Sequence, residues 1–375
     1  MMLEVKVKKS GTDHLFAWLA AGAALVAIVG AFIGLLTYLK SESEPHEDPS
    51  PPPTHAQLLF PDVEPWTRIG HNAVHRHVIN SLEFSPDGER LVSGSYDHTA
   101  RVWAVKTRAA LAVLPPDTEA YQAEGDVRGI TFSPDAKWIA AVYSKGMIRF
   151  WDAATFEMVG ERESDFGTSY DAQFTRGGEE LTIAHHSVIE SFNVANRTSK
   201  AIEDAHSSSI TTLATSEDGR LLASGDASGK LAIWQTDPWL AKHVIPVERD
   251  VEFVNLSPDG TRVVATIERA PAKVWQTLDA RELQTLTSEH KNIRASVAVF
   301  VGNNRYVVTA GSDAKLRLWD VDEGQLLKII DSDVSASAMA ISPSGEILAV
   351  GGNDGEIEWW KVGLPTTEEK IAKDP

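Results

Sequence analysis

The stretch SLEFSPDGERLVSGSYDHTARVW, residues 81–103, alternates short β-rich segments with turn residues. The tetrapeptide SPDG at residues 85–88 predicts a tight turn, because proline fixes one backbone angle and glycine permits the left-handed conformation. A second turn is expected around Tyr96–Thr99. Together with the flanking residues, the stretch predicts four antiparallel strands, at Ile79–Phe84, Leu91–Gly94, Ala100–Trp103 and Ala109–Leu114.

This unit recurs along the chain, and each copy ends its third strand with an aromatic residue. Those residues are Trp103, Trp151, Phe192, Trp234, Trp275, Trp319 and Trp360. Their spacing is close to the roughly 40–45 residues of a four-stranded propeller blade. The sequence therefore predicts an all-β, seven-bladed β-propeller.

The units resemble the WD-repeat family, over roughly residues 70–363. The Trp-Asp pair that names the family stands at Trp151-Asp152 and Trp319-Asp320. The resemblance implies that a histidine, a serine or threonine, and an aspartate hydrogen-bond to the blade tryptophan. The matching sets are His75, Ser93, Asp97 and Trp103 in the first unit, and His290, Thr309, Asp313 and Trp319 in the sixth. The fourth unit keeps His206, Ser224 and Trp234, with Ser228 at the expected aspartate position.

The seventh unit lacks a fourth strand. The segment at that offset, TTEEKI at residues 366–371, is polar and follows Pro365. The resemblance implies that an N-terminal segment closes the ring and so removes an exposed sheet edge. Gln57–Phe60 and Trp66–Ile69 are both suitable. We therefore expect the propeller to span residues 55–364, followed by a charged tail at 365–375.

The first 54 residues differ in composition from the rest. After a basic arm at residues 1–14, Leu15–Leu39 has no charged residue and is long enough for a transmembrane helix. The proline- and glutamate-rich residues 40–54 predict an extended spacer. Lysines before the helix predict a cytoplasmic N-terminus and an extracytoplasmic propeller, in the periplasm, a lumen or the exterior. A cleaved signal peptide is the alternative, which the long apolar run and poor cleavage site disfavour.

Small residues recur at four-residue spacing within this apolar segment, at Ala23, Ala27 and Ala31, and at Gly30 and Gly34. Such a face permits two helices to pack closely, which would give a weak homodimer. The alternative is the ordinary abundance of alanine and glycine in membrane helices.

The composition disfavours several kinds of chemistry. The net charge of −18 argues against a nucleic acid partner. The chain has no cysteine, which excludes thiolate metal sites and a cysteine nucleophile. His71, His75 and His77 invite a zinc site, but His75 already belongs to the repeat pattern and no carboxylate is near in sequence. We expect no metal, no cofactor and no enzymatic activity.

The leading functional prediction is a membrane-tethered scaffold that binds protein partners. The alternative is a small-molecule or catalytic site in the central channel. The predicted innermost strands hold Glu83, Asp171 and Glu252 but no histidine, which argues against that alternative.

One arc of turns is the candidate partner site. Six residues before the blade aromatic, the first, sixth and seventh units keep an aspartate, at Asp97, Asp313 and Asp354. The second to fifth units instead have Lys145, His186, Ser228 and Arg269. With the neighbouring Tyr96, His185 and Glu268, these residues predict a surface for an acidic partner. Ordinary degeneracy of the repeats is the alternative explanation.

Overall fold

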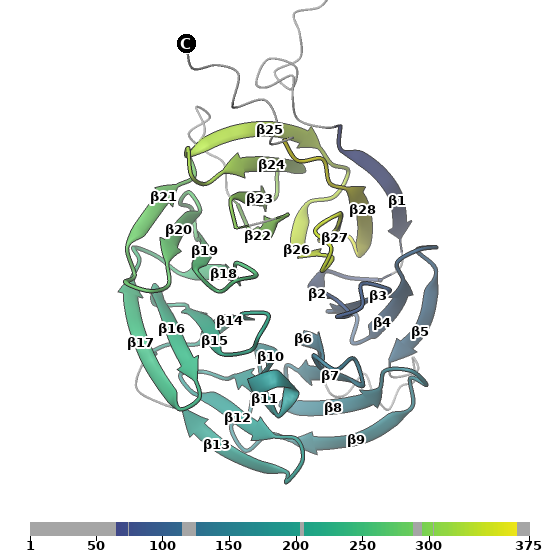
Figure 1. Cartoon of the computed structure of the whole chain (residues 1–375). Helices are drawn as coiled ribbons and strands as arrows, with labels where there is room; N and C mark the ends of the chain where they lie inside the picture. Colours follow the sequence, from purple (N-terminus) through teal and green to yellow (C-terminus); the bar gives the residue numbers. More distant parts are fainter. Residues whose placement is uncertain are drawn as a thin grey trace, which may run out of the picture. The chain divides into compact units, whose positions relative to one another are not determined.

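The computed structural model describes residues 65–73, 75–114, 125–202, 206–287, 295–302 and 304–365. Their strands form seven four-stranded antiparallel sheets arranged around a central channel (Figure 1). The predicted all-β, seven-bladed propeller is confirmed. We number the blades one to seven, beginning with the sheet that contains Ile79.

The two inner strands of each blade carry most of its buried apolar residues. The innermost strands are β2 (Ile79–Phe84), β6 (Val127–Phe132), β10 (Asp171–Thr175), β14 (Ile210–Thr215), β18 (Val251–Leu256), β22 (Val297–Val301) and β26 (Ala336–Ile341). The second strands are β3 (Arg90–Ser95), β7 (Trp138–Tyr143), β11 (Glu180–Ala184), β15 (Leu221–Asp226), β19 (Arg262–Ile267), β23 (Tyr306–Ala310) and β27 (Ile347–Gly352).

The two outer strands complete each sheet. The third strands are β4 (Ala100–Ala104), β8 (Met147–Asp152), β12 (Ile189–Asn193), β16 (Lys230–Thr236), β20 (Lys273–Gln276), β24 (Lys315–Asp320) and β28 (Glu356–Lys361). The outermost strands are β5 (Ala110–Leu114), β9 (Met158–Glu163), β13 (Thr198–Ile202), β17 (Trp239–Pro246), β21 (Glu282–Thr285), β25 (Gln325–Asp331) and, for blade seven, β1 (Thr67–Ala73).

The SPDG turn shows why the sequence reverses where it does. The N–H of Gly88 donates to the carbonyl of Ser85 at 2.8 Å, and Gly88 has a positive φ of 71°. The hydroxyl of Ser85 accepts a hydrogen bond from the N–H of Arg90 at 2.9 Å. The serine therefore fixes both ends of the turn, and the same serine-based turn recurs at Ser133, Ser216 and Ser257.

The disc has two unlike faces. One, which we call the connection face, carries the turns between second and third strands and the segments that link consecutive blades. The opposite face carries the turns between first and second strands and between third and fourth strands. This division follows from the antiparallel order of every sheet.

The hydrophobic core lies between blades rather than within them. One cluster joins Val92 of blade one to Ile130 of blade two, and another joins Ile79 of blade one to Ala349 of blade seven. Every blade thus buries both of its faces against its two neighbours. No blade can complete its core alone.

Side chains of the innermost strands also bridge the blades by hydrogen bonds around the channel. Each accepts from a backbone N–H of the next innermost strand, where no strand-to-strand ladder exists. The pairs are Glu83 with Phe132 at 2.8 Å, Asp171 with Leu213 at 2.8 Å, Thr212 with Val254 at 3.2 Å, and Asn255 with Phe300 at 3.1 Å.

The N-terminal strand β1 closes the ring by pairing with β28 of blade seven. It overlaps the predicted Trp66–Ile69 but runs on to Ala73, while Gln57–Phe60 lies outside the described residues. Arg68 donates to the buried carboxylate of Glu358 at 2.9 Å, and the indole N–H of Trp66 donates to the carbonyl of Gly363 at 2.7 Å. The closure is therefore a β ladder reinforced by an ion pair.

The described residues contain no helix long and apolar enough to cross a membrane. The predicted span Leu15–Leu39 lies outside them, as do the basic arm, the spacer at residues 40–54 and residues 366–375 of the tail.

Replacing Arg68 with methionine should lower the melting temperature by several degrees, because the fully buried carboxylate of Glu358 loses its cation. Adding Glu358→Gln should recover part of the loss, since it removes the uncompensated charge. Differential scanning calorimetry measures both. Arg220→Met is the control, because that side chain is 83% exposed. Equal melting temperatures for Arg68→Met and Arg220→Met would contradict the role of this ion pair in closure.

Candidate functional site: the connection face and the central channel

Blade one contains a hydrogen-bonded network of four residues. Nε2 of His75 lies 2.7 Å from the hydroxyl of Ser93, and Nδ1 lies 2.9 Å from a carboxylate oxygen of Asp97. The indole N–H of Trp103 donates to Ser93 at 3.0 Å. One proton arrangement satisfies every contact: Ser93 donates to Nε2, and Nδ1–H donates to Asp97. The network thus connects the segment before β2, which carries His75, to Ser93 in β3 and Trp103 in β4 by hydrogen bonds.

The environment sets the charge of this network. Burial lowers the pKa of His75 and outweighs the opposing hydrogen bond to Asp97. Burial by itself would raise the pKa of Asp97, but hydrogen bonds from His75, Thr99 and the N–H of Arg76 bring it below its ordinary value. The pair is therefore a neutral imidazole donating to a carboxylate at neutral pH.

Blade four contains the same network with a different aspartate. His206 contacts Ser224 at 2.6 Å through Nε2 and Asp226 at 2.9 Å through Nδ1, and Trp234 donates to Ser224 at 2.8 Å. The expectation that this blade has only Ser228 at the aspartate position is corrected. The carboxylate comes from a residue two positions earlier and also accepts from the N–H and hydroxyl of Ser228.

Replacing Asp226 with alanine should therefore lower the free energy of unfolding by about 1–3 kcal/mol, because it strips partners from buried donors. Ser228→Ala, at an exposed position of the same turn, should change it by less than about 0.5 kcal/mol. Urea unfolding of both variants measures the difference. A larger loss of stability for Ser228→Ala would mean that Ser228, and not Asp226, occupies the structural position of the aspartate in this blade.

Blades three and seven each bury a glutamate two residues before the blade aromatic. Glu190 accepts from Arg162 at 2.6 Å, Ser164 at 2.9 Å and Ser199 at 2.5 Å. Burial by itself would raise its pKa, but these bonds and one from His185 lower the pKa of Glu190 to about 2. Neither glutamate is among the site residues predicted from the sequence. An acidic residue inside an apolar strand, as in VIESF and EIEWW, is the signal that could have found them.

Glu358 has a comparable set of donors in blade seven. They are Trp360 at 3.0 Å, Ser332 at 2.7 Å, the N–H of Asp333 at 3.0 Å, and Arg68 from the closing strand. The aspartate predicted for this blade, Asp354, lies exposed and accepts from the N–H of Glu356 at 3.3 Å. The carboxylate that serves the blade tryptophan is therefore Glu358.

The remaining repeat residues are buried, cap turns or form ion pairs. Trp319 donates to Thr309 at 2.9 Å, and Trp151 and Trp275 are buried. Asp313 is exposed and pairs with Arg317. Asp152 caps the turn after β8 by accepting from the N–H of Thr155 at 2.8 Å. Asp320 accepts from Asp322 in the same way and pairs with Arg305. His290 lies outside the described residues.

The structure places Ser228 and five of the six predicted partner residues, all except His185, on the connection face. Lys145, His186, Ser228 and Arg269 are exposed in consecutive blades, and Glu268 pairs with Arg269 at 3.2 Å. Arg269 has a positive φ of 56° in a turn that precedes Pro271. Proline disfavours the helical region for the residue before it, so the left-handed residue of this turn is Arg269 rather than Ala270.

His185 does not belong to this surface. Its side chain is 1% exposed, with Nε2 3.0 Å from Glu190 and Nδ1 3.1 Å from the carbonyl of Thr168. The prediction that it faces a partner is corrected, because the imidazole turns inward to the buried carboxylate. Its neighbour His186 turns outward and contacts Tyr170 and Ser209, each at 3.2 Å.

Tyr96 lies partly exposed where blades one and two meet. The guanidinium carbon of Arg128 lies 4.6 Å from the centre of its ring, and Arg128 donates to its hydroxyl at 2.7 Å and to Asp126 at 3.2 Å. These contacts hold the ring in one orientation beside Arg128, which lines the channel. A fixed aromatic side chain costs little entropy on binding and suits an interaction surface.

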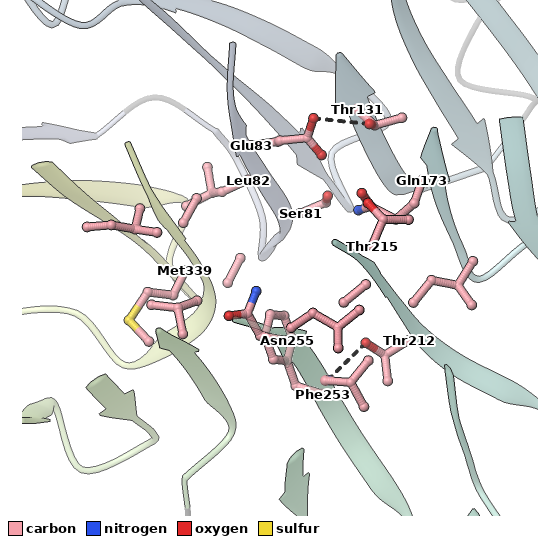
Figure 2. Close-up of a pocket in the computed structure, with 18 of the residues that line it drawn as sticks. Ser81, Leu82, Glu83, Thr131, Gln173, Thr212, Thr215, Phe253, Asn255 and Met339 are labelled. Atoms are coloured by element: carbon pink, nitrogen blue, oxygen red, sulfur yellow. Dashed lines mark hydrogen bonds between the residues drawn. The ribbon is translucent and has the colours of Figure 1, made fainter. Parts of the chain in front are cut away.

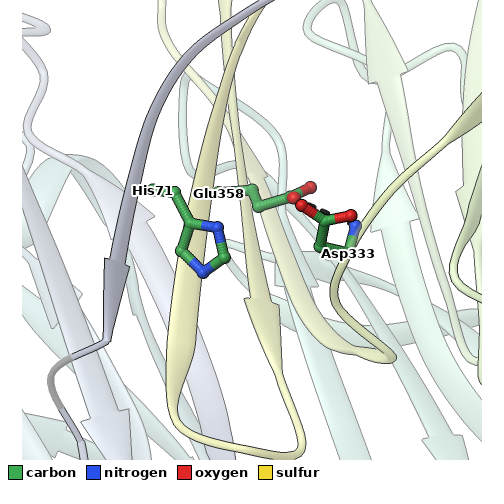
Figure 3. Close-up of side chains that lie close together, drawn as sticks. All are labelled: His71, Asp333 and Glu358. Carbon is green, nitrogen blue, oxygen red and sulfur yellow. Dashed lines mark hydrogen bonds between the residues drawn. The ribbon is translucent and has the colours of Figure 1, made fainter.

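His71, Asp333 and Glu358 bring three potential metal-ligand atoms within 4.8 Å of one another (Figure 3). Two observations argue against a cation. Arg68 already donates to both carboxylates, and His71 contacts Glu356 at 2.8 Å. The group belongs to the ring closure. His75, which the sequence also suggests as a zinc ligand, is instead held by hydrogen bonds with Ser93 and Asp97.

The central channel is a cavity of about 610 Å³ lined by all seven innermost strands. Figure 2 shows Glu83, Thr131 and Gln173 close together in the channel, and Met339 and Phe253 elsewhere on its wall. Burial raises the pKa of Glu83 to about 8, despite hydrogen bonds from Phe132, Thr131 and Gln173. Burial likewise raises the pKa of Asp171 to about 7.

These raised pKa values predict a dependence of stability on pH. The folded chain holds the Glu83 proton more tightly than the unfolded chain, so stability falls as pH rises from about 4.5 to about 8. Glu83→Gln keeps an acceptor for Phe132 and cannot ionise. The free energy of unfolding of this variant, relative to wild type, should therefore rise from pH 5 to pH 9 by an amount on the order of 1–4 kcal/mol. Its melting temperature should rise relative to wild type over the same range.

Thermal unfolding at several pH values measures this difference, with Glu157→Gln at an exposed turn as the matched control. A difference between Glu83→Gln and wild type that stays constant from pH 5 to pH 9 would mean that Glu83 does not titrate in this range.

The fold and the tryptophan networks define a repeat propeller. The family model described as "WD domain, G-beta repeat" matches residues 66–104, 118–152, 198–235, 281–320 and 324–361, about half of the chain. The chain therefore belongs to the WD40 repeat family. The unmatched segments hold the inner strands of blades three and five, where the histidine–aspartate network is absent among the described residues.

Several known proteins are similar to this chain. "Periodic tryptophan protein 2 homolog" of Neurospora crassa is 28% identical over 191 residues, 50% of this chain and 17% of that protein. "Cilia- and flagella-associated protein 52" of Homo sapiens is 24% identical over 251 residues, which are 62% of this chain and 38% of that protein. "Apoptotic protease-activating factor 1" of Homo sapiens is 23% identical over 356 residues, which are 80% of this chain and 27% of that protein. The chain thus spans well under half the length of these relatives.

Proposed function

We propose that this chain is a membrane-tethered scaffold whose WD40 propeller binds an acidic protein partner through its connection face. The observation that carries the proposal is the exposed arc of Lys145, His186, Ser228 and Arg269 in four consecutive blades. Three of these side chains are basic or can become so, on a chain with a net charge of −18. Local cationic character on an acidic protein favours encounter with an acidic surface.

Two positions of this arc support its proposed role in binding a partner. Glu190 and Asp226 supply the buried carboxylates of blades three and four, so the turn positions of His186 and Ser228 need not supply one. These positions can therefore carry side chains other than aspartate. Tyr96, held by Arg128, lies next to the arc in blade one and supplies an aromatic anchor.

The tether rests on sequence. Leu15–Leu39 has the length and composition of a transmembrane helix, and the lysines before it favour a cytoplasmic N-terminus. The direction of the closing strand is compatible with this role. Thr67 pairs with Lys361 at the opposite face, so the chain enters the propeller away from the connection face.

The names of the relatives refer to unrelated settings, namely cilia and flagella in one case and apoptotic protease activation in another. The similarity covers a minor part of each of them. We therefore propose binding of a protein partner without transferring a process from any relative.

Reversing both charges, Lys145→Glu with Arg269→Glu, should weaken capture of the partner at least tenfold, because two favourable charge interactions become repulsive. Affinity capture from detergent-solubilised membranes measures the loss. The matched control is Lys106→Glu with Arg220→Glu, which changes two exposed cations on the opposite face. Unchanged capture by the first pair, or a loss matched by a lower melting temperature, would leave repeat degeneracy as the explanation of the arc.

The tether predicts the side of the membrane on which the propeller lies. Protease added to intact spheroplasts, or to sealed vesicles of known orientation, should digest the propeller while a cytoplasmic marker survives. Protection of the whole domain until the membrane is opened would reverse the proposed topology.

A further inference from the structure

The channel of this propeller is lined by both polar and apolar side chains. Blades one to three contribute Ser81, Glu83, Thr131, Asp171 and Gln173, together with apolar residues such as Leu82 and Phe132. Blades five to seven contribute Phe253, Val297, Val299, Met339 and Ile341, together with polar residues such as Glu252 and Asn255. Its volume of about 610 Å³ falls within the range of small-molecule sites, which are mostly apolar with a few polar groups.

Hydrogen bonds between blades account for only part of this lining. Glu83 and Asp171 bridge the blades in this way, but blade six has only valine, alanine and phenylalanine along β22. These apolar side chains also pack in the core between blades, and where they line the channel they can make dispersion contacts with a molecule inside it.

The two carboxyl groups indicate the sign of that charge. Glu83 and Asp171 accept hydrogen bonds from backbone N–H groups and from neutral side chains, and neither pairs with a cation among the described residues. The other charged residues lining the cavity are Glu217, Glu252 and Arg128. Arg128 is engaged by Asp126 and Tyr96, and Glu217 and Glu252 are exposed, so Glu83 and Asp171 are the buried charge-bearing groups among the lining residues.

An organic cation is the ligand class that suits this lining. An ammonium group can pair with carboxyl groups that ionise on binding, whereas an anion or a neutral apolar molecule would offer these groups no counter-charge. A protonated amine can donate to Glu83 and Asp171 while its hydrocarbon body contacts the apolar side chains of the channel.

We propose that the central channel binds a small primary amine with an apolar body, its ammonium group at Glu83 and Asp171 and its body against Phe253, Val299 and Met339. This site lies inside the ring and is separate from the arc on the connection face. It therefore stands or falls independently of the proposed partner binding.

Because a bound ammonium group favours ionised carboxylates, binding should release protons near neutral pH. The raised pKa values of Glu83 and Asp171 place this release between about pH 6 and pH 9. Roughly one proton is expected per ligand at pH 7.5. Proton release distinguishes this mode from adsorption of an amine to exposed acidic groups, which are already ionised.

Isothermal titration calorimetry tests the proposal with 2-phenylethylamine as the probe. The full-length chain is titrated in one detergent buffer, with detergent alone as the reference. Titrations in phosphate and in HEPES at pH 7.5, neither of which is a primary amine, should give saturable one-to-one binding with different apparent enthalpies, since the buffers take up the released proton with different heats. The neutral isostere 2-phenylethanol should bind at least tenfold more weakly.

Two channel variants and one control complete the test. Glu83→Gln with Asp171→Asn should weaken binding at least tenfold and abolish the buffer dependence, while Met339→Gln should weaken binding without abolishing it. Glu157→Gln, at an exposed turn, should leave both unchanged. Melting temperatures establish that the variants are folded. Absence of saturable binding, equal binding of 2-phenylethanol, or unchanged binding by the double variant would each overturn the proposal.

Discussion

The structure depends on one constraint: no blade can bury its apolar faces without two neighbours. The clusters of core residues lie between blades, so each sheet contributes half of two separate cores. A ring of such sheets is stable only when the last blade meets the first. The strand β1 satisfies this requirement from the N-terminal side, through its ladder with β28 and the contact between Arg68 and Glu358. The tryptophan networks and the channel bonds then fix the blades at their final spacing.

The sequence predicts the regular part of this architecture well. The innermost strands Ile79–Phe84 and Val251–Leu256 have the expected bounds, because apolar alternation and serine-based turns determine them locally. The closing strand is harder to predict. Thr67–Ala73 is polar and solvent-facing, so its pairing with β28 depends on a partner nearly 300 residues away and leaves little apolar pattern.

The candidate site could be predicted only in part, because spacing records backbone position and not the reach of a side chain. Asp226 takes the place of an aspartate two residues later, and His185 turns inward although it follows directly on a strand. Glu190 and Glu358 contradict the apolar pattern of their strands. Their cationic partners, Arg162 for Glu190 and Arg68 for Glu358, come from another blade and from the closing strand, and no local window contains them. Blades thus keep a buried carboxylate near the aromatic while varying its source.

The direction of β1 has a mechanical consequence. Its first residue, Thr67, pairs with the last residue of β28, Lys361, so the N-terminal side of the chain leaves from one end of the closing ladder. A load drawn through this end would separate the ladder one residue pair at a time, beginning at Thr67, instead of shearing all pairs together. The closing ladder would then yield before the other strand pairs of the ring, and tension on the chain would first be relieved there.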